Sequence, residues 1–404
     1  MAKILISSLG TGRKSDGSYS TAKYKIDDET YETSFIADAL NKHLDFDAVF
    51  LIGTKKSIWD EAYQVFNGSD DEYYEELYEK KEAGEVDDAF LEKFRETTSV
   101  GLKTSIVNYG LNESEIWENF SEFLAIAKQV KDGDELYLDI THSFRSLALM
   151  SFVMTQFMQS ISNKQFKIKG VFYGMFEYSH DNDGITPIVD IKILFELQEW
   201  IKAIDAIKNY SDFNPLVRLL DENKIEDKVQ NTFINLNNAI SLGNISSMRQ
   251  FIAGAATKIK GIEKSENKII QLLAPEIVTL VEELEQEKES DFQYTLAKWF
   301  HKNKNYTLSY IALYEAIITK SCELAKVDTS SHDRREEEKK QIGSDKYGKY
   351  FYTMYPDSIS VIRNSIVHQS SDRQAFVSDD IERLKTFIDF FESYFKIENN
   401  VGQK

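Results

Sequence analysis

Residues close to the C-terminus could together carry out acid–base chemistry on a phosphate. The segment Arg363-Asn364-Ser365-Ile366-Val367-His368 follows Pro356 and Asp357 and is predicted to be helical. RNA is cleaved without a metal ion when its 2'-hydroxyl attacks the adjacent phosphate, a histidine serves in proton transfer or leaving-group stabilisation, and an arginine neutralises the phosphorane. Arg363, Asn364 and His368 are therefore candidate catalytic residues.

The spacing of these residues limits how one helix could use them. Asn364 and His368 are four residues apart and share a face, whereas Arg363 and His368 are five apart and diverge by roughly 140°. Two copies of the helix meeting at a twofold axis could direct both groups at one phosphate, which predicts a dimer. By spacing alone, an ordinary amphipathic helix with a surface histidine explains the segment better.

A loop of small residues follows the first apolar run of the chain. Small residues let a ligand approach the backbone, and open parallel sheets bind ligands at the carboxyl ends of their strands. The loop lacks the third glycine of a dinucleotide fingerprint, and Arg13 to Lys25 is predicted to be a longer polar loop. A plain strand-to-loop turn explains it at least as well. The candidate ligand contacts here are Ser8, Leu9, Gly10, Thr11 and Gly12.

A second polar segment, Asp139 to Ser146, lies where an apolar strand gives way to an apolar helix. Free N–H groups at a helix start suit an anion or the polar edge of a base, and an arginine there is unfavourable unless a negative group is near. Alternatively, Arg145 pairs with Asp139 and His142 packs as a polar core residue. Two polar loops at strand ends favour a shared binding cleft, with these further candidate contacts: Thr141, His142, Ser143 and Arg145.

The first half of the chain alternates predicted strands with predicted helices. Such alternation implies parallel strands joined by right-handed crossovers in a sheet covered on both faces, so we expect an α/β, Rossmann-like domain. The predicted strands are Lys3 to Leu9, Phe46 to Ile52, Leu102 to Tyr109, Glu135 to Ile140 and Phe166 to Tyr173. The predicted helices are Tyr31 to His43, Ser57 to Phe66, Glu113 to Val130 and Phe144 to Ser160.

After about Asp190 the strand pattern ends, and the second half is predicted to be all-α. Its last helix is expected to begin at the N-cap candidate Ser378 and to run to Phe395. The charge-dense stretch Ser330 to Lys349 is predicted to be a flexible loop.

Composition excludes several classes of protein. The chain has 404 residues, 42% of them apolar, and its only cysteine, Cys322, can form neither an internal disulfide nor a thiolate metal site. We expect Cys322 to be packed, and no histidine spacing suggests a metal site. The most apolar stretch, Leu147 to Ile161, is interrupted by polar residues, and the N-terminus lacks a signal-peptide core. We expect a soluble, cytoplasmic protein.

The net charge of −19 argues against a broad basic surface for nucleic acid. A short anionic ligand held by local groups remains compatible with it. Part of the excess lies in Asp70 to Glu96, which is predicted to be a solvated helical insertion.

Taken together, these motifs resemble the CARF-HEPN ribonucleases that accompany type III CRISPR systems, over essentially the whole chain. The resemblance rests on Ser8 to Gly12, on Asp139 to Ser146, on Leu313-Tyr314-Glu315-Ala316, and on the Arg-Asn-x-x-x-His motif at Arg363 to His368. It implies a CARF-like sensor domain at 1–190, a helical connector at 191–290 and a HEPN-like ribonuclease domain at 291–404.

The resemblance further implies a homodimer, or a higher oligomer, that binds cyclic oligoadenylate, most plainly cyclic tetra-adenylate, in the sensor domains. The ligand would be an allosteric activator rather than a cofactor, and the helical domain would be a metal-independent endoribonuclease for single-stranded RNA in antiviral defence. Arg363, Asn364 and His368 would be its nuclease residues.

Other functions stay open from the sequence. The chain could be a cyclic nucleotide-binding regulator without nuclease activity, or an enzyme activated by cyclic hexa-adenylate whose CARF domain also cleaves its ligand. A metabolic enzyme using an adenine nucleotide is a further alternative, against which the incomplete glycine fingerprint argues.

Overall fold

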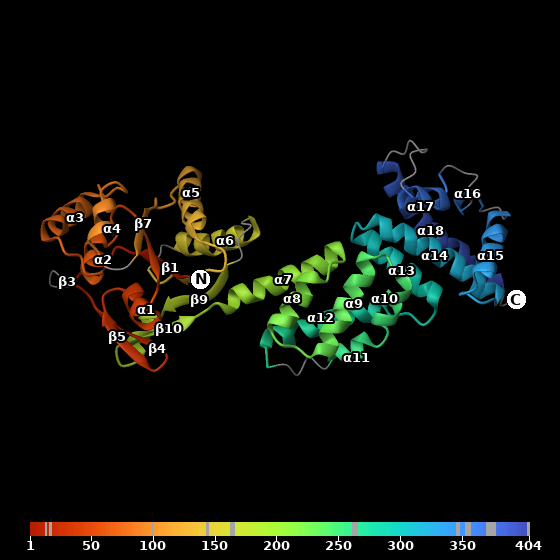
Figure 1. Ribbon diagram of the computed structural model, residues 1–404, viewed down its shortest axis with the longest axis horizontal. Coiled ribbons are helices and arrows are strands. Elements are labelled where there is room, and N and C mark those ends of the chain that lie inside the picture. Colours follow the sequence, from red (N-terminus) through yellow and green to blue (C-terminus); the bar gives the residue numbers. More distant parts are fainter. Residues whose placement is uncertain are drawn as a thin grey trace. The chain divides into compact units, whose positions relative to one another are not determined.

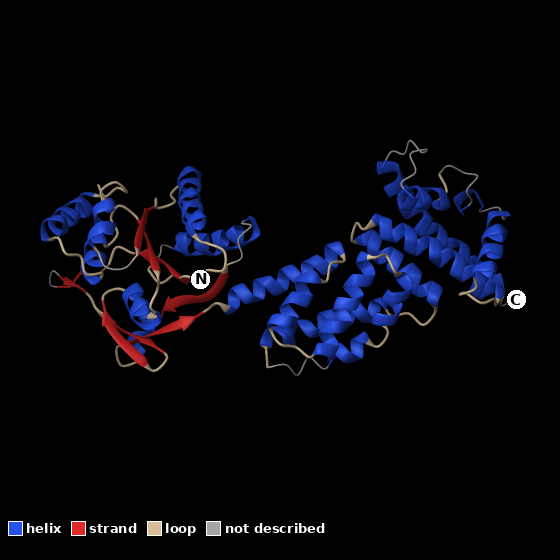
Figure 2. Ribbon diagram, in the orientation of Figure 1, coloured by secondary structure: helices blue, strands red, loops and turns tan. Residues whose placement is uncertain are grey.

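The computed structural model describes residues 1–12, 14–15, 18–98, 101–142, 145–161, 166–260, 266–344, 348–351, 357–368 and 377–401. The chain divides into two compact units, Met1–Phe195 and Glu196–Lys404. Among the described residues, Figure 2 shows all of the strands in the first unit and only helices in the second. The predicted order, an α/β half followed by an all-α half, is confirmed.

An eight-stranded sheet forms the centre of the first unit, in the order β5-β4-β10-β9-β8-β1-β6-β7. Its strands are β1 (Lys3–Leu9), β4 (Ala22–Ile26), β5 (Glu29–Thr33), β6 (Ala48–Gly53), β7 (Leu102–Ile106), β8 (Glu135–Asp139), β9 (Lys167–Gly174) and β10 (Ile185–Asp190). Strands β7, β6, β1, β8 and β9 pair in parallel, as predicted. The sheet is mixed at its other edge, where β10 is antiparallel to β9 and β5 is antiparallel to β4.

The strands of this mixed edge were not predicted from the sequence. The segment Glu29–Thr33 is polar and mostly exposed, and Ile185–Asp190 contains Pro187 and buries only Thr186 fully, so neither has the apolar run of a central strand. The predicted helix from Tyr31 was therefore wrong at its start, because β5 occupies Glu29–Thr33 and the helix begins at Ile36.

The helices of the first unit cover both faces of the sheet (Figure 1). They are α1 (Ile36–Leu44), α2 (Trp59–Val65), α3 (Asp71–Ala83), α4 (Leu91–Thr97), α5 (Glu113–Gln129) and α6 (Arg145–Ile161). Because side chains alternate along a strand, Leu5 and Leu9 pack under α1 to α4, whereas Ile4 and Ile6 pack under α5 and α6. The prediction that helices cover both faces of the sheet is thereby confirmed.

The predicted loop from Arg13 to Lys25 is wrong where the structure describes it. A small hairpin, β2 (Lys14–Ser15) with β3 (Ser18–Tyr19), lies within it, and β4 begins at Ala22.

The acidic insertion, Asp70 to Glu96, is helical as predicted, but it is only partly solvated. Tyr73, Leu77 and Phe94 are buried in the core, and Lys81 is only 5% exposed.

The second unit is built from helices around one continuous hydrophobic cluster that extends from Trp200 to Phe395. None of the described helices has the length and hydropathy of a membrane span. The helices, the first of which starts just before the unit boundary, are α7 (Ile193–Tyr210), α8 (Asn214–Glu222), α9 (Asp227–Ser241), α10 (Ile245–Ile252), α11 (Ala255–Lys260), α12 (Lys268–Leu284), α13 (Glu289–Lys302), α14 (Tyr306–Ala325), α15 (His332–Ser344), α16 (Gly348–Phe351), α17 (Ile359–His368) and α18 (Val377–Val401).

One predicted loop of this unit is a helix instead. The charge-dense stretch Ser330 to Lys349 contains α15, which buries Ile342 and forms an ion pair between Arg335 and Glu315 of α14. These two contacts stabilise α15, which the composition of the segment alone does not predict to be helical. The last helix begins at Val377, one residue before the predicted Ser378, and continues beyond Phe395 to Val401.

Candidate functional site

The first candidate site lies where β1 and β8 end side by side. After β1 the chain first forms β2 to β5, with β4 and β5 at the far edge of the sheet, and then returns to form β6 beside β1. β8 is followed along the sheet by β9 on its other side, so the next parallel strands after β1 and β8 lie on opposite sides of this pair. Such a switch point is where open α/β sheets bind ligands. The polar segments predicted to form one cleft follow these two strands.

A buried hydrogen bond joins the two strand ends. Ser7 and Asp139 are neighbours in the register, and the Ser7 hydroxyl donates to Oδ2 of Asp139 over 2.5 Å. Both side chains are inaccessible to water, with exposed fractions of 0% and 2%. Burial raises the pKa of Asp139 above its ordinary value. Both side chains therefore support the site from within the fold and do not contact a ligand at the surface.

Thr141 is fixed in the turn after β8. Its backbone N–H donates to Oδ1 of Asp139 over 2.9 Å, and its hydroxyl oxygen accepts from the N–H of Gly174 over 2.9 Å. The Thr141 hydroxyl also hydrogen-bonds to the Asp139 carboxylate, to which it donates because a carboxylate only accepts. The turn is thus tied to the ends of both β8 and β9.

The partly exposed His142 ring contacts two aromatic side chains. Its Nε2 lies 3.3 Å from the hydroxyl of Tyr24 on β4, and its ring centre lies 6.2 Å from that of Phe35. Burial lowers the pKa of His142, although the nearby Asp139 charge opposes this. A neutral imidazole offers one donor and one acceptor, which suits the edge of a nucleobase or a ribose hydroxyl.

The glycine loop after β1 touches the turn after β8. A Cβ at Gly10 would lie 3.0 Å from the carbonyl oxygen of His142, so the backbones approach closely at this point. The Gly10 carbonyl accepts from the N–H of Ile58, and the Leu9 carbonyl accepts from the Ser57 hydroxyl, over 3.0 and 2.8 Å. The structure therefore brings the two predicted polar loops together.

The predicted ligand contacts differ in how far they are accessible. Thr11 and Gly12 are exposed and Gly10 is half-buried, whereas Ser8 and Leu9 have buried side chains, that of Leu9 in the core. The prediction for Ser143 lies outside the described residues. Arg145 opens α6, but its side chain also lies outside them.

Sequence reasoning missed the aromatic side of this site. Tyr24 and Phe35 are both buried and both contact His142, yet they precede it by more than a hundred residues. The alternation of buried Tyr24 and Ile26 within Ala22–Ile26 was the available signal for a strand there.

The second candidate site lies on α17, which carries the predicted nuclease residues. The Arg363 guanidinium donates to Oδ1 of Asn364 over 3.1 Å and lies 5.1 Å from the ring centre of Tyr314 on α14. Its Nε is buried and has no hydrogen-bond partner among the described residues. Asn364 is half-buried, and His368 is the exposed last residue of α17. Arg363 and Asn364 are therefore together, with no hydrogen bond or ion pair to His368 in the described part of the chain.

Tyr314 is the centre of this second site. Its ring stacks on Phe351 with a centroid distance of 5.3 Å and an interplanar angle of 7°, and it also lies 5.7 Å from Nζ of Lys339. Two cationic side chains, Arg363 and Lys339, thus contact one ring. A tyrosine ring attracts such cations through the negative charge of its face.

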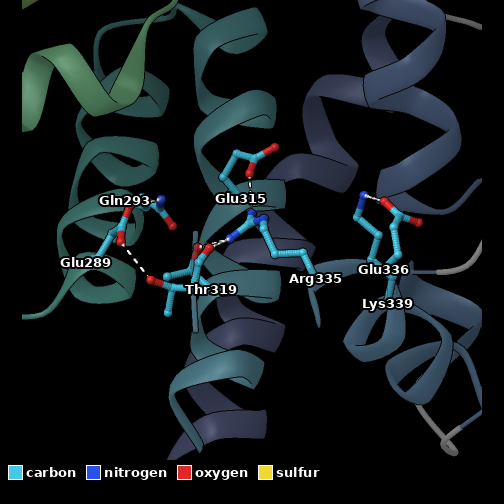
Figure 3. A network of polar contacts seen from close by, with 8 residues as sticks. Glu289, Gln293, Glu315, Thr319, Arg335, Glu336 and Lys339 are labelled. Atoms are coloured by element: carbon cyan, nitrogen blue, oxygen red, sulfur yellow. Dashed lines mark hydrogen bonds and ion pairs between the residues drawn. The ribbon is translucent and has the colours of Figure 1, made fainter. Parts of the chain in front are cut away.

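A polar network fixes α15 beside α14 (Figure 3). Arg335 reaches from α15 to the Glu315 carboxylate over 2.5 Å and to the Thr319 hydroxyl over 3.0 Å, both on α14. One turn further along α15, Lys339 donates to Glu336 over 2.5 Å. The network therefore determines where Lys339 lies relative to Tyr314.

Family models match two stretches of the chain. Residues 4–177 match the CARF domain of the CRISPR system endoribonuclease Csx1, and residues 196–290 match the second domain of the CRISPR-associated protein MJ1674. The first match contains all the residues of the first candidate site, where β1 and β8 end. The second covers the part of the helical unit before α14 and α17.

Comparisons with whole proteins found similarity at different levels. The CRISPR-associated protein MJ1674 of Methanocaldococcus jannaschii is 31% identical over 403 residues, which covers 91% of this chain and 62% of that protein. The chain thus spans less than two thirds of its relative's length. A solved structure of Enterococcus italicus Csm6 bound to cyclic hexa-2'-fluoro-hexa-dAMP aligns over 96% of this chain and 94% of its own, but with 12% identity and a TM-score of 0.37. The family models and the sequence relative thus make the chain similar to CRISPR-associated proteins, and its N-terminal unit is similar to a CARF domain.

Proposed function

We propose that the protein is a cyclic oligoadenylate-activated, metal-independent endoribonuclease for single-stranded RNA in type III CRISPR defence. The observation that carries the sensor half is the meeting of Gly10 and His142 at the switch point of a CARF sheet. The nuclease half is supported by Arg363 and Asn364 on α17 together with the motif that His368 completes. The protein would work as a homodimer, and the ligand would be an activator rather than a cofactor.

The sensor site has the chemistry that an adenylate ring requires. Thr11 and Gly12 are exposed, so a phosphate can approach their backbone, and His142 beside Thr141 offers a neutral imidazole to ribose or base. We propose Thr11, Ser143 and Arg145 as further contacts, with Ser8 and Leu9 contributing through their backbone. An even-numbered ring such as cyclic tetra-adenylate suits a twofold-symmetric dimer.

In the nuclease half, Arg363 would neutralise charge on the phosphorane and His368 would take part in proton transfer. The Arg363 guanidinium lies against the Tyr314 ring, and its Nε is buried. One Nη group donates to Asn364, and the remaining Nη hydrogens would donate to a phosphate. Because Arg363 and His368 share no contact within the described chain, the proposal requires helices α17 of two protomers to meet when the ligand binds. Ligand binding can favour that arrangement only through higher affinity for it.

Separation of the two activities tests the proposal. The His368→Ala variant should lose RNA cleavage and keep cyclic tetra-adenylate affinity, whereas Thr141→Ala should need more ligand for half-activation and reach the same maximal rate. Thermal shift with cyclic oligoadenylates of different sizes identifies the activator, because a ligand of the native state raises its stability. Binding with no cleavage at any ligand concentration would favour a regulator, and cleavage of labelled ligand by His368→Ala would add a ring-nuclease activity. If no cyclic oligoadenylate raises the melting temperature, the proposed function is wrong.

A further inference from the structure

A buried charged cluster lies beside the glycine loop, outside the two candidate sites. The ammonium of Lys81 donates to the Tyr19 hydroxyl over 2.8 Å, to Oδ2 of Asp60 over 3.1 Å and to Glu82 over 2.8 Å. The Tyr19 hydroxyl in turn donates to Asp60 over 2.9 Å. Asp60 is 0% exposed and Lys81 is 5% exposed, so water takes little part in this cluster.

The cluster joins three elements of the first unit. Lys81 comes from α3 of the acidic insertion, Asp60 from the first turn of α2, and Tyr19 from β3. All three ammonium hydrogens of Lys81 are used, since a lysine has three donors and no acceptor. Burial alone would lower the pKa of Lys81, but its bonds to Glu82, Tyr19 and Asp60 outweigh burial and raise the pKa, so the lysine stays charged.

Two of these elements enclose Gly12 in the glycine loop. A Cβ at Gly12 would lie 2.6 Å from Cγ2 of Ile58, which directly precedes α2, and 2.7 Å from the Tyr19 ring. Gly12 also has a φ of +68°, which a residue with a side chain rarely adopts. The N–H of Ile58 donates to the Gly10 carbonyl as well. The loop backbone is thus packed between the start of α2 and the Tyr19 ring, which Lys81 ties together.

We propose that Lys81, through Asp60 and Tyr19, is a positioning residue that holds the Gly10–Gly12 edge of the sensor site in its ligand-binding arrangement. The acidic insertion thereby has a defined role, since it supplies the lysine that forms an ion pair with Asp60 between α2 and β3. This inference rests on the proposed function, because it assigns Lys81 to the binding of the same cyclic oligoadenylate. Lys81 itself is covered by Tyr19 and need not touch the ligand.

Hydrogen exchange in the ligand-free protein tests the positioning role without any ligand. The amide of Ile58 reports on the loop, because its N–H donates to the Gly10 carbonyl. Lys81→Met should speed exchange of this amide by about tenfold, while amides of β8 exchange at the wild-type rate. Lys80→Met is the matched control, because Lys80 is the preceding residue of α3 and packs over Phe90 instead. An Ile58 amide that exchanges at the same rate in both variants would overturn the proposal.

Two further variants allow for the cost of leaving Asp60 charged and unpaired. Asp60→Asn with Lys81→Met removes both charges, and Tyr19→Phe removes only the hydroxyl link while keeping the ring against Gly12. If Lys81→Met fails to fold, the double variant should fold and show the faster loop exchange. Exchange at the wild-type rate in the folded double variant also contradicts the proposal.

The effect on ligand binding is measured with cyclic tetra-adenylate as the probe. If about a tenth of the Lys81→Met molecules keep the ordered loop, the dissociation constant of this variant rises about tenfold. The dissociation constant of Lys80→Met stays at the wild-type value. Faster loop exchange with unchanged affinity would overturn the role in binding. If the wild-type protein binds no cyclic oligoadenylate, the proposed function fails, and the exchange data still decide whether Lys81 holds the loop.

Discussion

The guanidinium of Arg363 lies 5.1 Å from the ring centre of Tyr314, so an arginine of α17 is held against an aromatic face of α14. The Tyr314 ring also stacks on Phe351 and contacts Lys339, and these two contacts fix the position of the ring. A planar guanidinium that is stacked on a ring loses little freedom when it then binds a phosphate. Tyr314 is accordingly the residue through which the helical core acts on the proposed nuclease motif.

Replacing Tyr314 with leucine should slow RNA cleavage by lowering kcat. Loss of a cation–π contact worth about 1–2 kcal/mol corresponds to a decrease of about fivefold to thirtyfold. Tyr314→Phe keeps the ring face and should retain most of the activity. Single-turnover cleavage with saturating ligand measures the rate, and thermal unfolding shows whether either variant is folded. Equal rates for Tyr314→Leu and Tyr314→Phe would contradict this role.

Adding a single methyl group to the glycine loop should weaken ligand binding. In Gly10→Ala the Cβ meets the His142 carbonyl oxygen at 3.0 Å, and in Gly12→Ala it meets Ile58 at 2.6 Å on a backbone with positive φ. Gly12→Ala should therefore have the larger effect. Isothermal titration with cyclic tetra-adenylate measures both, with Gly133→Ala as the control. Gly133 also has a positive φ, of +81°, but a Cβ there meets nothing within 4 Å. A weaker effect for Gly12→Ala than for Gly133→Ala would disagree with the described packing.

The folding stability should fall in mild acid because of His142. Burial lowers the pKa of His142 in the folded state below its ordinary value of about 6.5, so the unfolded chain binds the proton more readily. The stabilising contribution is therefore present above about pH 6.5 and is lost as the pH falls toward the folded pKa, at up to about 1.4 kcal/mol per pH unit. Denaturant unfolding at about pH 7.5 and pH 5.5 should show a larger loss for wild type than for His142→Gln. Equal losses would mean that His142 does not titrate in this range.

The sequence predicted the parts of the fold that have strong periodic patterns. The apolar run Lys3 to Leu9 became β1 with those bounds, and the pattern Glu113 to Val130 became α5 at Glu113–Gln129. The helix α15 was wrongly predicted as a loop, because its stability comes from Arg335 on Glu315 and from buried Ile342 rather than from an apolar stripe. Local pattern identifies elements that carry their own apolar face, and it misses elements held by distant partners.

The candidate sites show the same division. Gly10 and His142 were assigned to one cleft because parallel strands end at one edge, and the structure places these two residues next to each other. The partners of Lys81 lie 21 and 62 residues away in the chain, so no spacing rule links them. The acidic composition around Lys81 instead predicted a solvated surface. A single buried lysine among many carboxylates carries no signal in the composition.

Cleavage of a fluorescent single-stranded RNA in EDTA tests the central claim most directly. The reaction is run with cyclic tetra-adenylate, with cyclic hexa-adenylate and without ligand, and His368→Ala serves as the inactive control. We expect the wild-type protein to cleave RNA only when a cyclic oligoadenylate is present, and the His368→Ala protein not to cleave it at all. RNA cleavage that is indifferent to both ligands, or that requires an added metal ion, would contradict the account.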